Sequence, residues 1–324
     1  MLHASRRSVV LRQTFCVVAL LLVAGSARAE LTGNLPRGQY GLTAGTQIPT
    51  GLAVAPLLYN FHPTSVVDPS GDSVPSSGSF NTLAAPALNI WWVSPWKILG
   101  GTYGAALTLW GTAPMAEFPK IGGLSSTSYG LGDSYLKPFE LGWHTTHVDT
   151  ITGVAFYIPT GRYTPGASDN TGEGQWGAQV SGGATVWFDH ARHVNAATLA
   201  YVDVYAPKSA KVDASNVRLH TGSILGMQGG VGYQFWRGAF NVGIPYFFER
   251  KLSEDTLPPG AGKVLPGISA AKSWSVGTGL EGGFYWGQSS AVVLRWLQGV
   301  AGSNTTLGST VFLTFSYVFA FATR

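Results

Sequence analysis

The chain has 324 residues, of which only 11% are charged, whereas charged residues make up about a quarter of a typical soluble domain. Of its 20 basic residues, four lie among the first 29, which contain no acidic residue, so the rest of the chain has 16 basic against 16 acidic residues. The composition therefore excludes the basic surface that nucleic-acid binding needs, and it disfavours a surface built to dissolve in water.

The first 29 residues have the pattern of a secretory signal peptide. Arginines precede an apolar run at 15–25, and Ala27-Arg28-Ala29 fits the small-x-small cleavage rule, which makes Glu30 the expected first mature residue. A membrane anchor is disfavoured, because a helix needs about 20 apolar residues to cross a bilayer. Cys16, the only cysteine, lies in this run, so the mature chain is expected to lack disulfides and thiolate sites.

Residues 30–50 form a segment with several glycines ahead of the first clear strand. Their pattern leaves three alternatives open: a strand, a periplasmic tail, or a segment folded into the lumen of a barrel. From residue 51 to 324 the sequence indicates one continuous β-domain without a long helix or a strict repeat. We therefore expect a signal peptide at 1–29, this N-terminal segment at 30–50 and a barrel at 51–324.

Apolar and polar residues alternate repeatedly after residue 50, as in strands whose two faces meet different surroundings. Near the end, Leu313, Phe315 and Tyr317 alternate with Thr314 and Ser316. A closed barrel is the structure, other than a helix, that satisfies backbone hydrogen bonds in lipid. We predict an all-β, transmembrane antiparallel up-and-down barrel of about twelve strands, at 51–62, 87–95, 102–112, 131–140, 146–158, 175–188, 193–206, 216–234, 238–248, 273–286, 289–299 and 308–321.

The connections between these strands are expected to alternate in length. Outer-membrane barrels have short periplasmic turns and long outer loops, so this rhythm predicts the outer membrane of a Gram-negative-type cell. An even number of strands also brings both termini to the periplasmic side. The short connections fall near 95–101, 141–145, 189–192, 235–237 and 287–288, and the longer ones near 63–86, 113–130, 159–174, 207–215, 249–272 and 300–307.

Aromatic residues gather at the ends of the expected strands, for example Trp91, Trp92, Trp143 and Trp236. Girdles of aromatic side chains at the two membrane interfaces have this placement. The alternative is the core of a soluble, exported β-sandwich, which the low charge content disfavours.

Several blocks of the sequence resemble the outer-membrane family named for the meta-pathway of phenol degradation. They are WWVSPWKILG at 91–100, GLGDSY at 130–135, LGWH at 141–144 and FYIPTGRY at 156–163, followed by NTG at 170–172. The resemblance implies a barrel that lets hydrophobic or aromatic small molecules cross the outer membrane. It also implies a distant similarity to the long-chain fatty-acid channels.

Ionisable residues at inward parity are the candidate functional groups, because an arginine or lysine that faces lipid near the midplane costs about 2–4 kcal/mol. The charges could pair across a narrow barrel and close it to ions, or they could line and gate a path. Tyrosines of the same parity could add a partly apolar path for aromatic solutes. The candidate lumen-lining residues are Asp133, Lys137, Asp149, Asp203, Arg218, Glu281, Arg295, Tyr135, Tyr157, Tyr201 and Tyr205.

Two His-x-x-His spacings, at 144–147 and 190–193, are the ones that suggest a metal. Residues three apart on a strand point to opposite faces, so solvated turn histidines are the simpler interpretation. The sequence contains neither a Gly-x-Ser-x-Gly nucleophile elbow nor a phosphate-binding loop. We therefore expect no enzyme, no metal and no cofactor.

The sequence favours a channel for passive uptake of hydrophobic or aromatic small molecules. A barrel of about twelve strands is narrow beside the 16–18 strands of water-filled porins. Two alternatives stay open: a structural or loop-presenting barrel with a plugged lumen, and an outer-membrane hydrolase. The expected partners are outer-membrane lipid, the solute, and the barrel-assembly machinery, which would recognise the C-terminal strand.

Overall fold

The computed structural model describes residues 35–74, 79–112, 114–117, 125–127, 129–164, 170–212, 215–256, 270–287 and 289–320. The regular elements in these ranges are all β-strands, and no helix there is long and apolar enough to cross a membrane. The expected signal peptide at 1–29 lies outside the described residues and stays a prediction.

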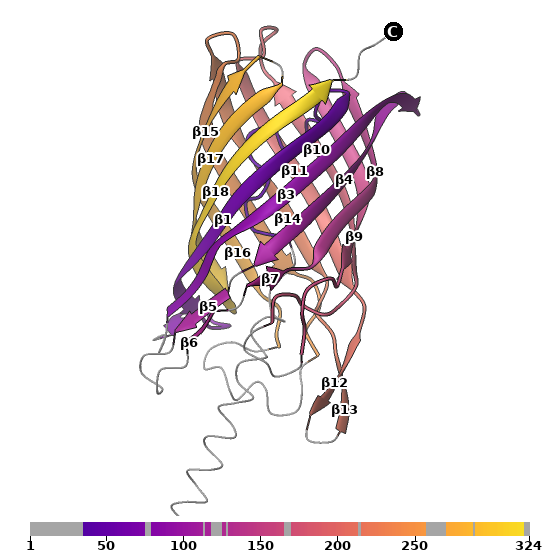
Figure 1. Cartoon of the computed structure of the whole chain (residues 1–324). Coiled ribbons are helices and arrows are strands. Elements are labelled where there is room, and N and C mark those ends of the chain that lie inside the picture. Colours follow the sequence, from indigo (N-terminus) through magenta and orange to yellow (C-terminus); the bar gives the residue numbers. More distant parts are fainter. Residues whose placement is uncertain are drawn as a thin grey trace, which may run out of the picture.

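Twelve antiparallel strands close into one barrel (Figure 1). The first strand pairs with the last strand on one side and with β3 on the other, which completes the ring. Closure gives each strand a neighbour on both sides, as backbone groups in lipid require. The barrel strands are β1 (Gly51–Val67), β3 (Ser79–Ile98), β4 (Gly101–Thr112), β8 (Ser134–His144), β9 (Val148–Ile158), β10 (Gly177–Trp187), β11 (Val194–Tyr205), β14 (Ile224–Phe235), β15 (Phe240–Lys251), β16 (Trp274–Trp286), β17 (Ser290–Ser303) and β18 (Thr305–Ala320).

The remaining strands are short and belong to the connections. In Figure 1, β5, β6, β12 and β13 lie at the lower end, away from the C-terminus. We call this the loop end, and we call the opposite end, with the short connections, the turn end. The short strands are β2 (Ser73–Val74), β5 (Pro114–Glu117), β6 (Ser125–Thr127), β7 (Gly130–Leu131), β12 (Lys208–Val212) and β13 (Ser215–Leu219).

Each of the twelve predicted strands overlaps one barrel strand, so the predicted fold class is confirmed. The predicted start of the strand at 216–234 is wrong, because 215–219 is β13 and the barrel strand begins at Ile224. The break lies at Gly222. The Cβ of any other residue at this position would lie 2.0 Å from the carbonyl oxygen of Ser253, so the two backbones can approach only because residue 222 is glycine. The N–H of Gly222 donates to the Asp255 carboxylate at 2.7 Å instead of to a neighbouring strand.

The predicted long connection at 300–307 is also wrong, because Asn304 alone separates β17 from β18. The two strands diverge here: Ser303 pairs with β16, and Thr305 pairs with β1. Asn304 has a φ of 53°, a left-handed conformation that asparagine tolerates. Its side-chain amide donates to the carbonyl oxygen of Ala271 at 2.7 Å. Neighbouring strands therefore hold both ends of the reversal without a loop.

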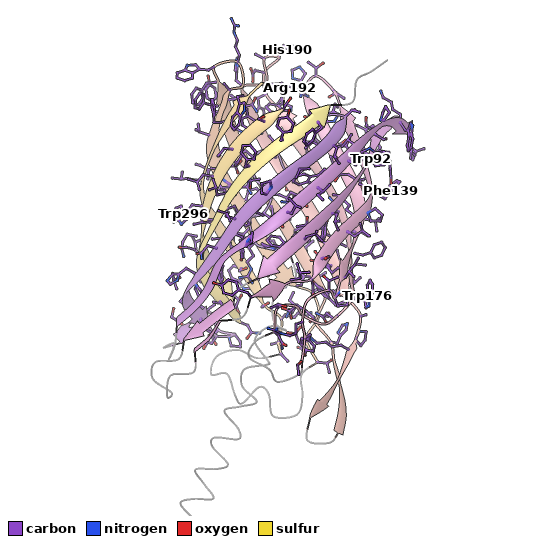
Figure 2. The ribbon with its side chains drawn as sticks, in the orientation of Figure 1. Trp92, Phe139, Trp176, His190, Arg192 and Trp296 are labelled. Carbon is purple, nitrogen blue, oxygen red and sulfur yellow. The ribbon has the colours of Figure 1, made fainter. Side chains whose placement is uncertain are left out.

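The outer face of the barrel is apolar, whereas the inner face is largely polar. On β9, Val154 and Phe156 are exposed, and Asp149 and Tyr157 of the other parity are buried. Side chains such as Trp296 project outward from the wall (Figure 2). A closed barrel with exposed apolar side chains around it suits hydrocarbon, so the chain is a transmembrane β-barrel.

Residues 35–50 run through the interior as an irregular segment, drawn in indigo in Figure 1, which we call the lumen segment. Inward side chains hold its backbone. Gln228 accepts a hydrogen bond from the N–H of Tyr40 at 2.9 Å, and Thr185 accepts one from the N–H of Gly45 at 3.1 Å. The barrel wall therefore fixes this segment through polar contacts made from several strands.

Candidate functional site

Four inward tyrosines form one cluster on the barrel wall. Tyr135, Tyr157, Tyr201 and Tyr205 come from β8, β9 and β11, and each is at most 5% exposed. The ring centroids of Tyr135 and Tyr157 are 5.4 Å apart, and those of Tyr157 and Tyr205 are 5.9 Å apart. The structure thus brings these four candidates together, and Leu35 of the lumen segment joins them.

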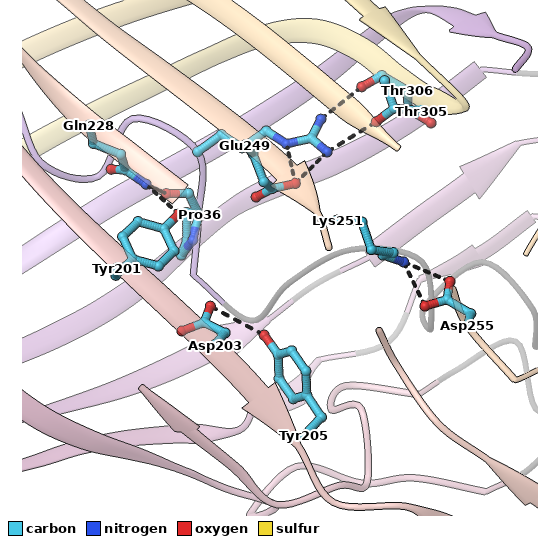
Figure 3. Close-up of polar contacts among 11 residues, drawn as sticks. Pro36, Tyr201, Asp203, Tyr205, Gln228, Glu249, Lys251, Asp255, Thr305 and Thr306 are labelled. Atoms are coloured by element: carbon cyan, nitrogen blue, oxygen red, sulfur yellow. Dashed lines mark hydrogen bonds and ion pairs between the residues drawn. The ribbon is translucent and has the colours of Figure 1, made fainter. Parts of the chain in front are cut away.

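Asp203 is the polar centre of this cluster. It accepts hydrogen bonds from the Tyr157 hydroxyl at 3.2 Å and from Gln179 Nε2 at 2.8 Å. It also accepts one from the Tyr205 hydroxyl at 3.4 Å, which Figure 3 shows. Tyr135 donates to Gln179 Oε1 at 2.7 Å, which extends the network. Buried networks whose members are paired hold one arrangement, so this wall is expected to be rigid.

Other candidate charges are paired inside the barrel. Lys137 Nζ lies 2.9 Å from Glu140 Oε2, and Arg295 Nε lies 2.5 Å from Glu281 Oε2. Arg295 also donates to the carbonyl oxygen of Gly38 at 2.9 Å. The second ion pair therefore binds the wall to the lumen segment.

Sequence reasoning missed the ion pair between Arg37 and Glu249. Arg37 Nη2 lies 2.8 Å from Glu249 Oε1, and Arg37 also donates to Thr305 Oγ1 and to the carbonyl oxygen of Thr306, both at 3.0 Å (Figure 3). Arg37 precedes the predicted strands, and Glu249 was assigned to a loop although β15 extends to Lys251. The outward residues before Glu249 alternate regularly, and this pattern could have extended the strand.

Asp149 lies at the turn end and is fully buried. Its carboxylate accepts hydrogen bonds from Arg192 Nη2 at 2.7 Å, from Trp187 Nε1 at 3.0 Å and from the hydroxyl of Thr46 at 3.1 Å. Thr46 belongs to the lumen segment, so this candidate residue also anchors that segment.

Two candidates lie away from the inner wall. Asp133 follows β7 in the connection at the loop end, where it accepts hydrogen bonds from the backbone N–H of Gly161 and of Glu173. Arg218 belongs to β13, and its side chain lies outside the described residues. Neither therefore has a described position on the barrel wall.

Neither His-x-x-His spacing brings its own two histidines together at one site. His147 and His190, one from each spacing, have ring centroids 4.5 Å apart, whereas His193 Nδ1 lies 2.9 Å from Asp189. The backbone N–H groups of Val194 and His193 donate to the Asp189 carboxylate and lower its pKa below the usual value. Within the described ranges, no group of three or more His, Cys, Asp or Glu side chains could hold a metal ion.

A second inner surface is apolar and was not among the sequence-based candidates. We call it the aromatic wall. On β18, Phe312 lies on the same inward face as Thr310 and Thr314. An aromatic residue on an otherwise polar face is the sequence signal that could have revealed this surface. The aromatic wall consists of Leu57, Tyr59, Ala87, Trp110, Phe247, Leu297 and Phe312.

Comparison with solved structures finds an outer membrane channel from Pseudomonas putida F1, at 14% identity and a TM-score of 0.71, covering 88% of this chain and 100% of that chain. The β domain of the Bordetella autotransporter BrkA has 15% identity and a TM-score of 0.49, and the match covers 84% of this chain and 100% of that chain. A mutant of the monoaromatic hydrocarbon channel TodX has 11% identity and a TM-score of 0.39, and the match covers 84% of this chain and 91% of that chain. The first likeness shows a shared fold. No curated protein matches the sequence.

The family described as "Putative MetA-pathway of phenol degradation" matches residues 65–315. The match extends from the last residues of β1 into β18 and covers well over half of the chain. It includes the blocks between 91 and 172 that carry the resemblance in the sequence, so that recognition is confirmed. The chain belongs to this phenol-degradation family.

Proposed function

We propose that this protein is an outer-membrane channel for the passive uptake of hydrophobic or aromatic small molecules. The observation that carries the proposal is a closed barrel with apolar side chains outside and an aromatic wall within. An uncharged aromatic molecule gains free energy when its surface leaves water for apolar contact, so such an interior favours its entry. The name of the family supports the same solute class, and the outer membrane channel among the solved structures shares the fold.

In this proposal the loop end faces outward and the turn end faces the periplasm, as in bacterial barrels with short periplasmic turns. Export would remove residues 1–29, and the barrel-assembly machinery would recognise β18. Transport would follow the concentration gradient of the solute through weak contacts, with no covalent step.

A structural or loop-presenting barrel with a plugged lumen is the second candidate. The observation in its favour is the lumen segment, whose contacts with Gln228, Thr185 and Arg295 fix it inside the barrel. The two candidates differ in one respect: a channel requires that solute passes beside this segment or displaces it.

Uptake by intact cells distinguishes the candidates. Cells of a Gram-negative host that express the full chain are compared with cells that carry the empty vector, and the initial uptake of radiolabelled naphthalene and of radiolabelled sucrose is measured. We expect faster naphthalene uptake and unchanged sucrose uptake, because a narrow barrel is a poor path for bulk water.

Heat-modifiable migration of the protein on a gel verifies that the barrel is folded in these cells. If the folded barrel leaves both uptake rates at the level of the vector, the plugged barrel is supported and the channel is contradicted. If both rates rise, the protein is a general hydrophilic pore and the proposed solute class is wrong.

A further inference from the structure

The inner face of the barrel has two walls of different chemistry. The first wall carries the tyrosine cluster with Asp203 and Gln179 and is built from β8, β9, β10, β11 and β14. The second is the aromatic wall, whose residues come from β15, β17, β18, β1, β3 and β4. The order of the strands puts these two sets on separate arcs of the ring.

The lumen segment packs its apolar side chains against the first wall. Leu35 and Tyr40 contact the tyrosine cluster, and Ala44 belongs to a small cluster on β9 and β11. As far as the structure describes the chain, the aromatic wall contains no side chain from the lumen segment. The segment comes close to it at Gly38, where a Cβ would lie 2.5 Å from Leu297 Cδ1. The apolar side chains of the segment thus face the first wall, whereas Arg37 and the carbonyl oxygen of Gly38 make polar contacts with strands of the other arc.

The rings of the aromatic wall contact one another. Tyr59 meets Trp110 edge to face at 6.0 Å between centroids, and it meets Phe312 at 5.1 Å. Tyr59 and Trp110 are only partly buried, whereas Phe247, Leu297 and Phe312 beside them are at most 3% exposed. A partly exposed pair of rings on a packed apolar support offers a flat, uncharged ring both contact area and favourable ring geometry.

The first wall is a poorer surface for the same molecule. The hydroxyls of Tyr135 and Tyr157 are committed to Gln179 and Asp203, and an apolar solute inserted among them would separate buried donors from their acceptors. Unpaired buried polar groups are costly, and the solute has no group that could replace the lost partners. The two walls therefore suit different occupants.

We propose that the aromatic wall is the solute-binding face of the lumen, with Tyr59 and Trp110 as contact residues and uncharged planar aromatic molecules as ligands. The first wall receives the apolar side chains of the lumen segment, so the rings of Tyr59 and Trp110 stay partly exposed. This inference rests on the proposed uptake function and adds to it a site and a preference for aromatic over saturated solutes. Binding is by contact alone, and no bond forms or breaks.

The test compares two solutes of similar size, naphthalene and its saturated counterpart decahydronaphthalene. Initial uptake of each is measured in intact cells expressing the full chain, above the rate of vector cells. Trp110→Leu and Tyr59→Leu keep the wall apolar but each remove one of the two contact rings. We expect each to lower the ratio of naphthalene to decahydronaphthalene uptake about 3- to 10-fold, the range of one lost ring contact.

Tyr205→Leu, which removes a ring from the first wall, is the matched control, and its ratio is expected to match that of the parent. Phe312→Leu, which removes the ring that supports Tyr59, serves as a further variant if Trp110→Leu or Tyr59→Leu fails to give a heat-modifiable barrel. Normal uptake with an unchanged ratio in the ring-removing variants overturns the inference and leaves the channel standing. An equal fall in Tyr205→Leu overturns the assignment to one wall. No uptake by the parent chain contradicts the proposed function itself.

Discussion

The carboxylate of Asp133 joins two separate segments of the connection that follows β9. Its Oδ1 accepts a hydrogen bond from the N–H of Gly161 at 3.1 Å, and its Oδ2 accepts one from the N–H of Glu173 at 2.7 Å. Gly161 and Gly172 approach so closely that a Cβ on Gly161 would lie 2.7 Å from Gly172 Cα. These contacts unite three of the sequence blocks that carry the family resemblance, so Asp133 organises the loop end.

Replacement of Asp133 by Asn is expected to loosen this connection. One of the two oxygen acceptors becomes an N–H₂ group that faces a backbone donor, and a hydrogen bond to a charged group contributes about 1.5–3 kcal/mol. We expect the amides of Gly161 and Glu173 to exchange with deuterium about 10- to 100-fold faster. Asp72→Asn, in the exposed loop after β1, is the control; equal exchange in both variants contradicts the role of Asp133.

Side-chain parity predicts which face of a strand a residue occupies, but it does not predict its partner. Tyr157 and Asp203 lie on the inner face of their strands, as their parity indicates. Their hydrogen bond connects positions 46 residues apart, and the pair of Arg37 with Glu249 connects positions 212 apart. Such contacts depend on how the barrel closes, and no local pattern contains that information.

The hairpin of β3 and β4 presents apolar side chains at a turn, where polar residues are usual. Leu99 and Gly100 form the turn with φ values of 51° and 78°. A left-handed conformation costs about 1–2 kcal/mol for a residue such as leucine. The Leu99 side chain is also 88% exposed. Trp96 is also exposed and meets Trp92 of the lipid-facing surface edge to face at 5.6 Å. This tip therefore continues the apolar outer face.

We expect the tip of this hairpin to lie in the interfacial region of the bilayer. The mature chain is expected to lack cysteine, so Leu99→Cys can carry a single environment-sensitive fluorophore in lipid nanodiscs. Because apolar side chains gain from burial at the headgroup boundary, quenching by spin-labelled lipid should be stronger at position 99 than at the polar turn between β8 and β9, labelled through Thr146→Cys. Equal, weak quenching at both positions would place the tip in water.

The strands could be predicted because their signal is local. Each barrel strand has one face toward lipid and one toward the lumen, so its apolar and polar residues alternate with a period of two. Lipid also excludes charged residues from the outer face. β13 was not separated from β14, because its residues continue the same alternation, and the break at Gly222 depends on contacts with the distant residues Ser253 and Asp255. The tight reversal at Asn304 was missed for a similar reason: it depends on pairing with β16 and β1.

The whole molecule combines a rigid ring with a segment that crosses its interior. Arg37 pairs with Glu249 of β15, two residues before that strand ends at the loop end, and Thr46 bonds to Asp149 at the turn end. Both anchors are polar and lie against a largely buried inner wall. Because a buried charge without its partner is strongly unfavourable, the position of the lumen segment is expected to depend on these pairs.

Glu249→Gln should therefore release the lumen segment from the wall near the loop end. The Arg37 guanidinium keeps Thr305 and Thr306 but loses its carboxylate, which weakens docking by about 1.5–3 kcal/mol and shifts the docked equilibrium about 10- to 100-fold toward release. In planar bilayers we expect openings to become more frequent by that factor. Arg250→Gln, one residue further on the exposed outer face, is the matched control. If Glu249→Gln opens no more often than this control, the ion pair does not hold the segment across the path, and its other contacts, with Gln228, Thr185, Asp149 and Arg295, keep it in place.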